Sequence, residues 1–289
     1  MMNLSVSNLL RLTAFMAVVA VSASNAQTNG TKATADVRPV DAAGTVKTPR
    51  AVPFSVGEQL TYEGKLSKII SGISIAELTF TVGEVAETND YLISAEARSK
   101  GTLLKIFRFS FLQKIDSTVD RDEFFAEKTV KVDVQKERVR NSEALFDYDD
   151  RRVTYVETDP KDPMRPPRTI ASELAGETHD LISGIYQLRL LPLKVGDKYD
   201  ITVSDSGLVY TVPVTVTGRE QQKTAIGKVW CVKVEPDVFG EGKMIERDGS
   251  MTIWITDDVR RIPVRSVIQS PYGKIEVKIK SARNIAKQS

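Results

Sequence analysis

Cysteine and histidine are almost missing from this chain, which has one of each, Cys231 and His179, in 289 residues. One cysteine cannot form an internal disulfide, and the shortage of both residues excludes multi-cysteine and multi-histidine zinc sites. A serine triad would have to use His179 as its base, but this residue stands beside Asp180 where a helical pattern starts, so we interpret it as structural. We interpret Cys231 as an unreactive thiol in a strand.

Signature motifs and strong charge bias are also lacking. The patterns H-E-x-x-H, G-x-S-x-G and G-x-x-x-x-G-K-[ST] do not occur. The 40 basic and 38 acidic residues are interspersed, with a net charge of +2, so no general attraction to nucleic acid is expected. Beyond the N-terminal region no apolar run reaches the roughly 20 residues of a membrane span. We therefore expect no cofactor, no metal site, no nucleic-acid partner and no transmembrane segment after signal cleavage.

The N-terminus has the pattern of a signal peptide. Arg11 gives a positive charge, residues 12–21 form a short apolar run, and Ser24-Asn25-Ala26 fits the small-x-small cleavage rule. We predict cleavage after residue 26 and a periplasmic or secreted protein exported by the Sec-type route. Residues 27–53 are rich in Thr and Ala without apolar periodicity, which predicts a disordered leader. The predicted folded domain covers 54–283, followed by a tail at 284–289.

Alternating apolar and polar residues dominate the predicted domain. Val130, Val132 and Val134 alternate with Lys131 and Asp133, a period of two that indicates a strand with two different faces. The same alternation occurs at 77–82, 210–216 and 275–280. We therefore predict a mainly β protein, an antiparallel curled sheet or barrel-like single domain, with apolar side chains inward and charged side chains facing water.

Turn residues separate the predicted strands. Asn89-Asp90, Asp149-Asp150 and Ser206-Gly207 each lie between two strand-like runs and predict hairpins. A change of parity near Ala76 predicts a β-bulge that bends its strand.

One segment has helical rather than strand spacing. Apolar residues recur every three or four positions over 178–191, with Thr178 as a candidate cap and Pro192 at the end, so we expect one helix packed on the sheet. The preceding segment, 159–176, contains four prolines and is expected to be a long irregular loop.

Four residues are candidates for a binding surface. Tyr186 and Arg189 lie three positions apart on the predicted helix, where the arginine can pair with a carboxylate, anchor a loop or hold an anionic ligand. Phe109 and Trp254 lie in strand-like segments, where they either fill the core or line a cavity for an apolar ligand. No catalytic residue is assigned.

Paired carboxylates are the remaining catalytic option. Asp257-Asp258 and the Asp147–Asp150 group can serve glycoside hydrolysis only if two carboxylates meet in a cleft. Both groups precede arginine pairs and resemble charged hairpin tips, and a calcium site in the second group lacks the usual loop pattern.

Three ordered motifs resemble a known family. They are Phe54-Ser-Val-Gly-Glu-Gln-Leu-Thr-Tyr62, then Ser183-Gly-Ile-Tyr-Gln-Leu-Arg189 with Leu191-Pro-Leu-Lys-Val-Gly-Asp197, and finally Trp254-Ile-Thr-Asp-Asp-Val-Arg-Arg-Ile-Pro-Val264. Together they resemble the bacterial domain of unknown function 3108, over most of residues 54–280. The resemblance implies an exported β-rich envelope domain and brings no activity, cofactor or catalytic residue. One departure is Ile70-Ser71-Gly72-Ile73, where the family often has a small-residue segment.

These observations favour a non-catalytic envelope protein that binds an apolar or amphipathic ligand, or a partner protein, on its curled sheet. A large enclosed apolar cavity is needed for the ligand version. The alternatives are a carboxylate-based hydrolase of envelope glycans and a structural assembly factor that uses an exposed edge strand.

Overall fold

The computed structural model describes residues 51–67, 72–102, 105, 108–271 and 273–286. Its first eight strands are β1 (Gln59–Ser67), β2 (Ile73–Glu84), β3 (Tyr91–Ser99), β4 (Phe111–Val119), β5 (Ala126–Gln135), β6 (Arg138–Asp147), β7 (Arg152–Thr158) and β8 (Arg168–Glu173). They are followed by β9 (His179–Asp180), helix α3 (Leu181–Leu190), β10 (Lys198–Asp205), β11 (Leu208–Thr224), β12 (Gly227–Pro236), β13 (Ser250–Thr256), β14 (Pro263–Ser270) and β15 (Gly273–Arg283). The predicted signal peptide and the leader up to residue 50 lie outside the described residues.

All of these strands belong to one sheet of 15 strands, in the order β8-β7-β6-β5-β4-β3-β2-β1-β15-β14-β13-β12-β11-β10-β9. The first and last strands, β1 and β15, pair in the middle of this order. Strands β1–β8 form one meander on one side of this pair, and strands β15–β10 form a second meander on the other side. All pairs are antiparallel except the short parallel pair of β9 and β10. The prediction of a mainly β antiparallel sheet is confirmed.

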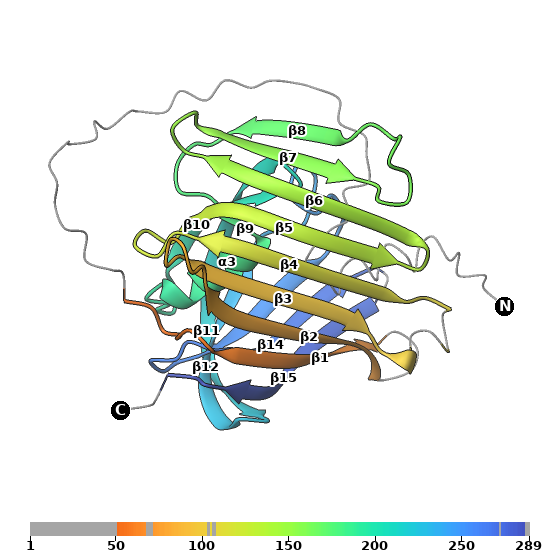
Figure 1. The fold of residues 1–289 in the computed structure, drawn as a ribbon. Helices are drawn as coiled ribbons and strands as arrows, with labels where there is room; N and C mark the ends of the chain where they lie inside the picture. Colours follow the sequence, from red (N-terminus) through yellow and green to blue (C-terminus); the bar gives the residue numbers. More distant parts are fainter. Residues whose placement is uncertain (1–50, 68–71, 103–104, 106–107, 272, 287–289) are drawn as a thin grey trace, which may run out of the picture.

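The sheet curls over on itself without closing (Figure 1). Register shifts in several strand pairs, including one between Gly64 and Lys65 opposite Ala76, insert bulges that increase local twist and bend a sheet. The predicted bulge near Ala76 is therefore confirmed. The two ends of the sheet approach each other where the Ser172 hydroxyl on β8 donates to the Gly207 carbonyl, at 2.6 Å, in the β10–β11 turn.

Helix α3 lies inside the curl, between the two halves of the sheet (Figure 1). Asp180, rather than the expected Thr178, is the N-cap, because its side chain accepts the backbone N–H groups of Ile182 and Ser183 while the Ser183 hydroxyl accepts the N–H of Asp180. This reciprocal pair satisfies donors that would otherwise be buried without partners. The predicted helix near 178–191 is confirmed, and none of the described helices is long and apolar enough to cross a bilayer.

Three apolar clusters fill the interior among the described residues. The largest packs the inner sides of β1, β2 and β10–β15, the second surrounds α3, and the third lies under β6–β8. The second contains four aromatic residues, Phe54, Tyr91, Phe124 and Tyr186, with Phe54 in ring contact with each of the others. Because these side chains lie on the concave side of the sheet, they form a packed core in the space that the described strands enclose.

Strand β5 departs from the expected orientation. Thr129 and Lys131 point toward α3, while Val130 on the opposite face is 37% exposed. The reason is that this strand faces the polar N-terminus of α3, where the Thr129 hydroxyl donates to the Asp180 carboxylate at 2.6 Å. The expectation that apolar side chains always face inward is wrong for β5.

Candidate functional site

Arg189 is the centre of a buried ion pair that joins three distant segments. Its guanidinium donates to both carboxylate oxygens of Glu58, at 2.5 and 2.9 Å, and neither side chain has any exposed surface. It also donates to the carbonyl oxygens of Pro53 and Arg260, at 3.3 and 3.0 Å. Glu58, Arg189 and Arg260 come one from each of the three sequence motifs, so the motifs meet at a single charged group.

The electrostatics of this group suit a permanent ion pair. Burial lowers the pKa of Arg189, but the hydrogen bonds and charge of Glu58 outweigh it and hold that pKa above its ordinary value. The guanidinium also lies 5.1 Å from the ring centre of Phe54 and 4.9 Å from that of Tyr186. Burial raises the pKa of Tyr186. Tyr186 and Arg189 are therefore buried against other parts of the protein and present no exposed surface on which a ligand could bind.

Trp254 and Phe109 lie apart from that ion pair and have neighbours of their own. The indole N–H of Trp254 donates to Glu220 at 2.5 Å, and the guanidinium of Arg265 covers its ring at 4.4 Å. Phe109 is 2% exposed and packs against Phe111. The four candidate residues therefore do not form one surface, although Phe109 and Trp254 share the largest apolar cluster.

A small cavity lies between the inner face of β5–β7 and the start of α3. Its volume is about 40 Å³, and both polar and apolar residues line it. The polar lining includes Lys131, Ser142, Ser204 and Asp205. Such a volume accommodates a few water molecules, whereas ligand pockets of about 300 Å³ or more hold apolar molecules. The large apolar cavity that the ligand hypothesis needs is therefore not this one.

Two polar groups in the cavity wall are only weakly satisfied. The Ser204 hydroxyl is buried and has no hydrogen-bond partner among the described residues. Burial lowers the pKa of Lys131, an effect that the nearby carboxylates of Asp205 and Asp133 oppose without cancelling. Buried polar groups of this kind favour a polar occupant such as water over an apolar one.

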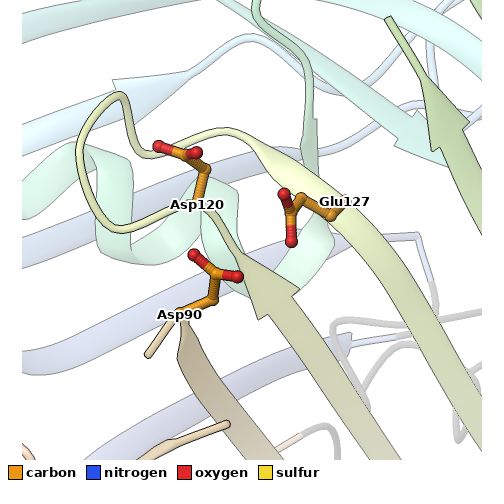
Figure 2. A group of neighbouring side chains, drawn as sticks. All are labelled: Asp90, Asp120 and Glu127. Atoms are coloured by element: carbon orange, nitrogen blue, oxygen red, sulfur yellow. The ribbon is translucent and has the colours of Figure 1, made fainter. Parts of the chain in front are cut away.

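Three carboxylates meet where neighbouring strands β3, β4 and β5 begin or end, as Figure 2 shows. Asp90 precedes β3, Asp120 follows β4 and Glu127 lies on β5, and one oxygen from each comes within 4.8 Å of the others. Asp120 accepts the N–H groups of Asp122 and Glu123, and Asp90 accepts that of Arg121. Oxygen ligands of this kind suit calcium. The sequence gives no sign of this cluster, because its members are separated along the chain and fit no loop motif.

Burial and the crowding of these carboxylates raise the pKa of Glu127. Burial first, and then the charges of Asp90 and Asp120, raise the pKa of Glu127, and a hydrogen bond with Asp90 adds to the effect. Glu127 thus holds its proton to higher pH in the folded protein than in the unfolded chain, and stability contributed by that proton is complete below the ordinary pKa of 4.5 and is lost as pH rises through the raised value.

Glu127→Gln is therefore expected to stabilise the protein near pH 7 and to flatten the pH dependence of stability. The neutral amide removes one of three crowded negative charges and can still hydrogen bond to Asp90. Urea unfolding from about pH 4 to about pH 8 measures this, with Glu143→Gln, an exposed partner of Lys128, as the control. Equal pH profiles for the wild type and Glu127→Gln would show that folding does not raise the pKa of Glu127.

The carboxylates that the sequence offered for glycoside hydrolysis occupy turns. Asp257 pairs with Arg219 and Arg261, and Asp258 pairs with Arg260 on the β13–β14 turn. Asp147 caps the β6–β7 turn by accepting the N–H of Asp150 at 2.8 Å. The arginine pairs and the cap give these groups the structural roles of charged hairpin tips, and the hydrolase hypothesis has no carboxylate pair in a cleft at these positions.

Strand β8 has a free edge at one end of the described sheet. β8 ends the strand order and pairs only with β7, whereas the opposite end is the two-residue β9, whose residues are each 3% exposed. The middle of β8 is Thr169-Ile-Ala-Ser172, which carries no charge. Charged or covered edges are the usual protection against pairing with another chain. β8 carries charges only at its two ends, Arg168 and Glu173, and the β10–β11 turn contacts it through Ser172.

The hydrogen bonds beside β8 identify which of its backbone groups are free. Leu174 N–H donates to the Arg151 carbonyl at 2.9 Å, in the same register that pairs β7 with β8. Hydrogen-bonded and non-bonded pairs alternate in an antiparallel ladder, so Ile170 and Ser172 also bond to β7. The N–H and C=O groups of Thr169, Ala171 and Glu173 therefore point away from the sheet, and these three residues are exposed.

The prediction of an irregular loop over 159–176 is wrong for residues 168–173, which form β8. The four prolines of the segment precede the strand, and they predict a break in regular structure, so the strand could not be recognised from the sequence. The β-branched pair Thr169-Ile170 was the only signal of a strand.

The sequence matches the model of one protein family. The model of the family described as "Protein of unknown function (DUF3108)" matches residues 59–280, most of the chain. The chain belongs to the DUF3108 family. No curated protein matches this DUF3108 chain.

Three solved structures match most of the DUF3108 chain at low sequence identity. A β-barrel-like protein of the domain of unknown function DUF1849 from Brucella abortus has a TM-score of 0.51 at 13% identity, covering 80% of this chain and 98% of that one. A Bacteroides fragilis protein, provisionally called an exported protein with a YmcC-like fold, has a TM-score of 0.30 at 10% identity over 82% and 100% of the two chains. A Parabacteroides distasonis protein, provisionally called a lipoprotein, has a TM-score of 0.31 at 9% identity over 81% and 97%. The first of these supports the β-barrel-like fold.

Proposed function

We propose that this DUF3108 protein is exported to the bacterial envelope, has no catalytic activity, and binds a partner protein that adds a strand to the edge of β8. The observation that carries the proposal is the outer edge of β8, which pairs with no other described strand and whose middle, residues 169–172, carries no charge, at the end of a sheet that does not close. Strand addition satisfies the outward N–H and C=O groups of Thr169, Ala171 and Glu173, and it needs no pocket.

The export part of the proposal rests on the signal-peptide pattern of residues 1–26. Two of the structures with a related outline are provisionally called an exported protein and a lipoprotein, which agrees with an envelope location. The preference for a protein partner over an apolar ligand rests on the apolar side chains packed inside the described sheet and on the cavity beside α3, whose volume of about 40 Å³ is too small for a lipid chain.

The matched pair Ala171→Pro and Ala225→Pro tests the edge. Proline at 171 removes one outward N–H but leaves the bonds of Ile170 and Ser172 to β7, so the fold should persist. Proline at 225 makes the same change in the exposed β11–β12 turn, away from β8. A photo-crosslinking residue at Thr169 in living cells is expected to give protein adducts that Ala171→Pro abolishes and Ala225→Pro preserves. Adducts that persist unchanged with Ala171→Pro would rule out strand addition at this edge.

A further inference from the structure

The outward groups of β8 are arranged so that the strand can pair with itself. In a symmetric antiparallel pair the two-fold axis runs perpendicular to the sheet, so the same face of both copies lies on one side and residues of like parity stand opposite each other. Outward-pointing residues must meet outward-pointing residues to form hydrogen bonds. For β8 these are Thr169, Ala171 and Glu173, and their central member is Ala171.

We propose that the partner at this edge is a second copy of the chain, joined by an antiparallel β8–β8 pair centred on Ala171; this inference rests on the function proposed above. The two Ala171 residues exchange N–H and C=O bonds across the axis, and Thr169 of each copy pairs with Glu173 of the other. Three such pairs supply about six hydrogen bonds. The result is one continuous sheet that runs through both copies.

The side chains of β8 favour this register. At the axis the two Ala171 methyl groups are small enough to pass each other, and on the same face the Thr169 hydroxyl faces the Glu173 carboxylate of the other copy and can donate to it. On the inner face Ile170 stands opposite Ser172, so no two like charges are opposed. A pair centred on Ile170 would bring two isoleucines together and would form fewer hydrogen bonds, since only Thr169 and Ala171 could meet.

The native Cys231 does not interfere with a test by disulfide crosslinking. This only cysteine of the chain is buried, and burial raises the pKa of its thiol to about 12, so it will not compete with an introduced exposed thiol. In the proposed pair the two Ala171 Cα atoms lie about 5.5 Å apart, within the span of a disulfide. Positions 169 and 173 are opposite each other but far from their own copies.

The experiment is mild oxidation of full mature protein carrying one introduced cysteine. Ala171→Cys is expected to form a covalent dimer, Thr169→Cys and Glu173→Cys alone are expected to stay monomeric, and a mixture of those two variants is expected to form the mixed dimer. Light scattering should show a dimer whose dissociation constant Ala171→Pro raises about tenfold or more, because two central hydrogen bonds are lost, while Ala225→Pro leaves it unchanged.

Equal crosslinking of Ala171→Cys and Thr169→Cys, or a monomer at all concentrations, would overturn the self-pairing. That failure is distinct from failure of the proposed function. If the protein is monomeric and Ala171→Pro still abolishes the adducts formed at Thr169 in cells, a different protein occupies the edge. If the dimer forms and the adducts have twice the monomer mass, the partner is the second copy.

Discussion

Glu58→Ala is expected to lower the free energy of unfolding by about 3–5 kcal/mol, the cost of leaving one member of a buried ion pair without its partner. Arg189 would keep its charge in a site with no exposed surface, with two backbone carbonyls as its remaining acceptors. Urea unfolding followed by circular dichroism measures the change. The same substitution at Glu77, whose pair with Lys280 is exposed, is the control and should cost less than about 1 kcal/mol.

A double variant separates charge burial from packing. Glu58→Leu with Arg189→Met removes both charges and keeps apolar volume, so it should be markedly more stable than Glu58→Ala. A loss below about 1 kcal/mol for Glu58→Ala would mean that the three motifs are not held together by this pair. A double variant as unstable as the single one would assign the loss to packing around Phe54 and Tyr186.

Gly207→Ala is expected to cost about 2–4 kcal/mol, from left-handed backbone strain together with overpacking. Gly207 has a φ of +83°, and a methyl group on it would lie 2.7 Å from the Tyr155 Cβ and 3.0 Å from the Ile170 Cβ. The β10–β11 turn presses against β7 and β8 at this point, so the added carbon must separate the two ends of the curled sheet.

Gly227→Ala is the matched control for this effect. Gly227 also has a positive φ, +110°, but nothing lies within 4 Å of the position that a methyl group would take. Gly227→Ala should therefore lower the free energy of unfolding only by the cost of the backbone strain, about 1–2 kcal/mol. Thermal unfolding of both variants checks the prediction, and equal losses would mean that contact between the ends of the sheet contributes nothing to stability.

Local sequence patterns predicted the elements whose stability is decided locally. The helix at 181–190 and the hairpin turns at Asn89, Asp149 and Ser206 follow from short-range spacing and turn chemistry, and the structure confirms them. The family motifs were also recognisable, since each is a contiguous stretch of chain.

Features that depend on distant partners could not be predicted in this way. Glu58 and Arg189 are 131 positions apart, so their pairing has no local signal. The inward orientation of Lys131 depends on the polar end of α3, because alternation defines two faces of a strand without saying which one is buried. β8 is held by β7 and by the turn at Gly207, and its own sequence has little strand propensity.

Amide hydrogen exchange along β8 tests the central claim most directly. The free-edge arrangement predicts slow exchange at Ile170 and Ser172 at every protein concentration, and fast exchange at Thr169, Ala171 and Glu173 in dilute protein that slows as the concentration rises. Slow exchange at all five amides in dilute protein would contradict the account, because the edge would then be occupied within a single chain.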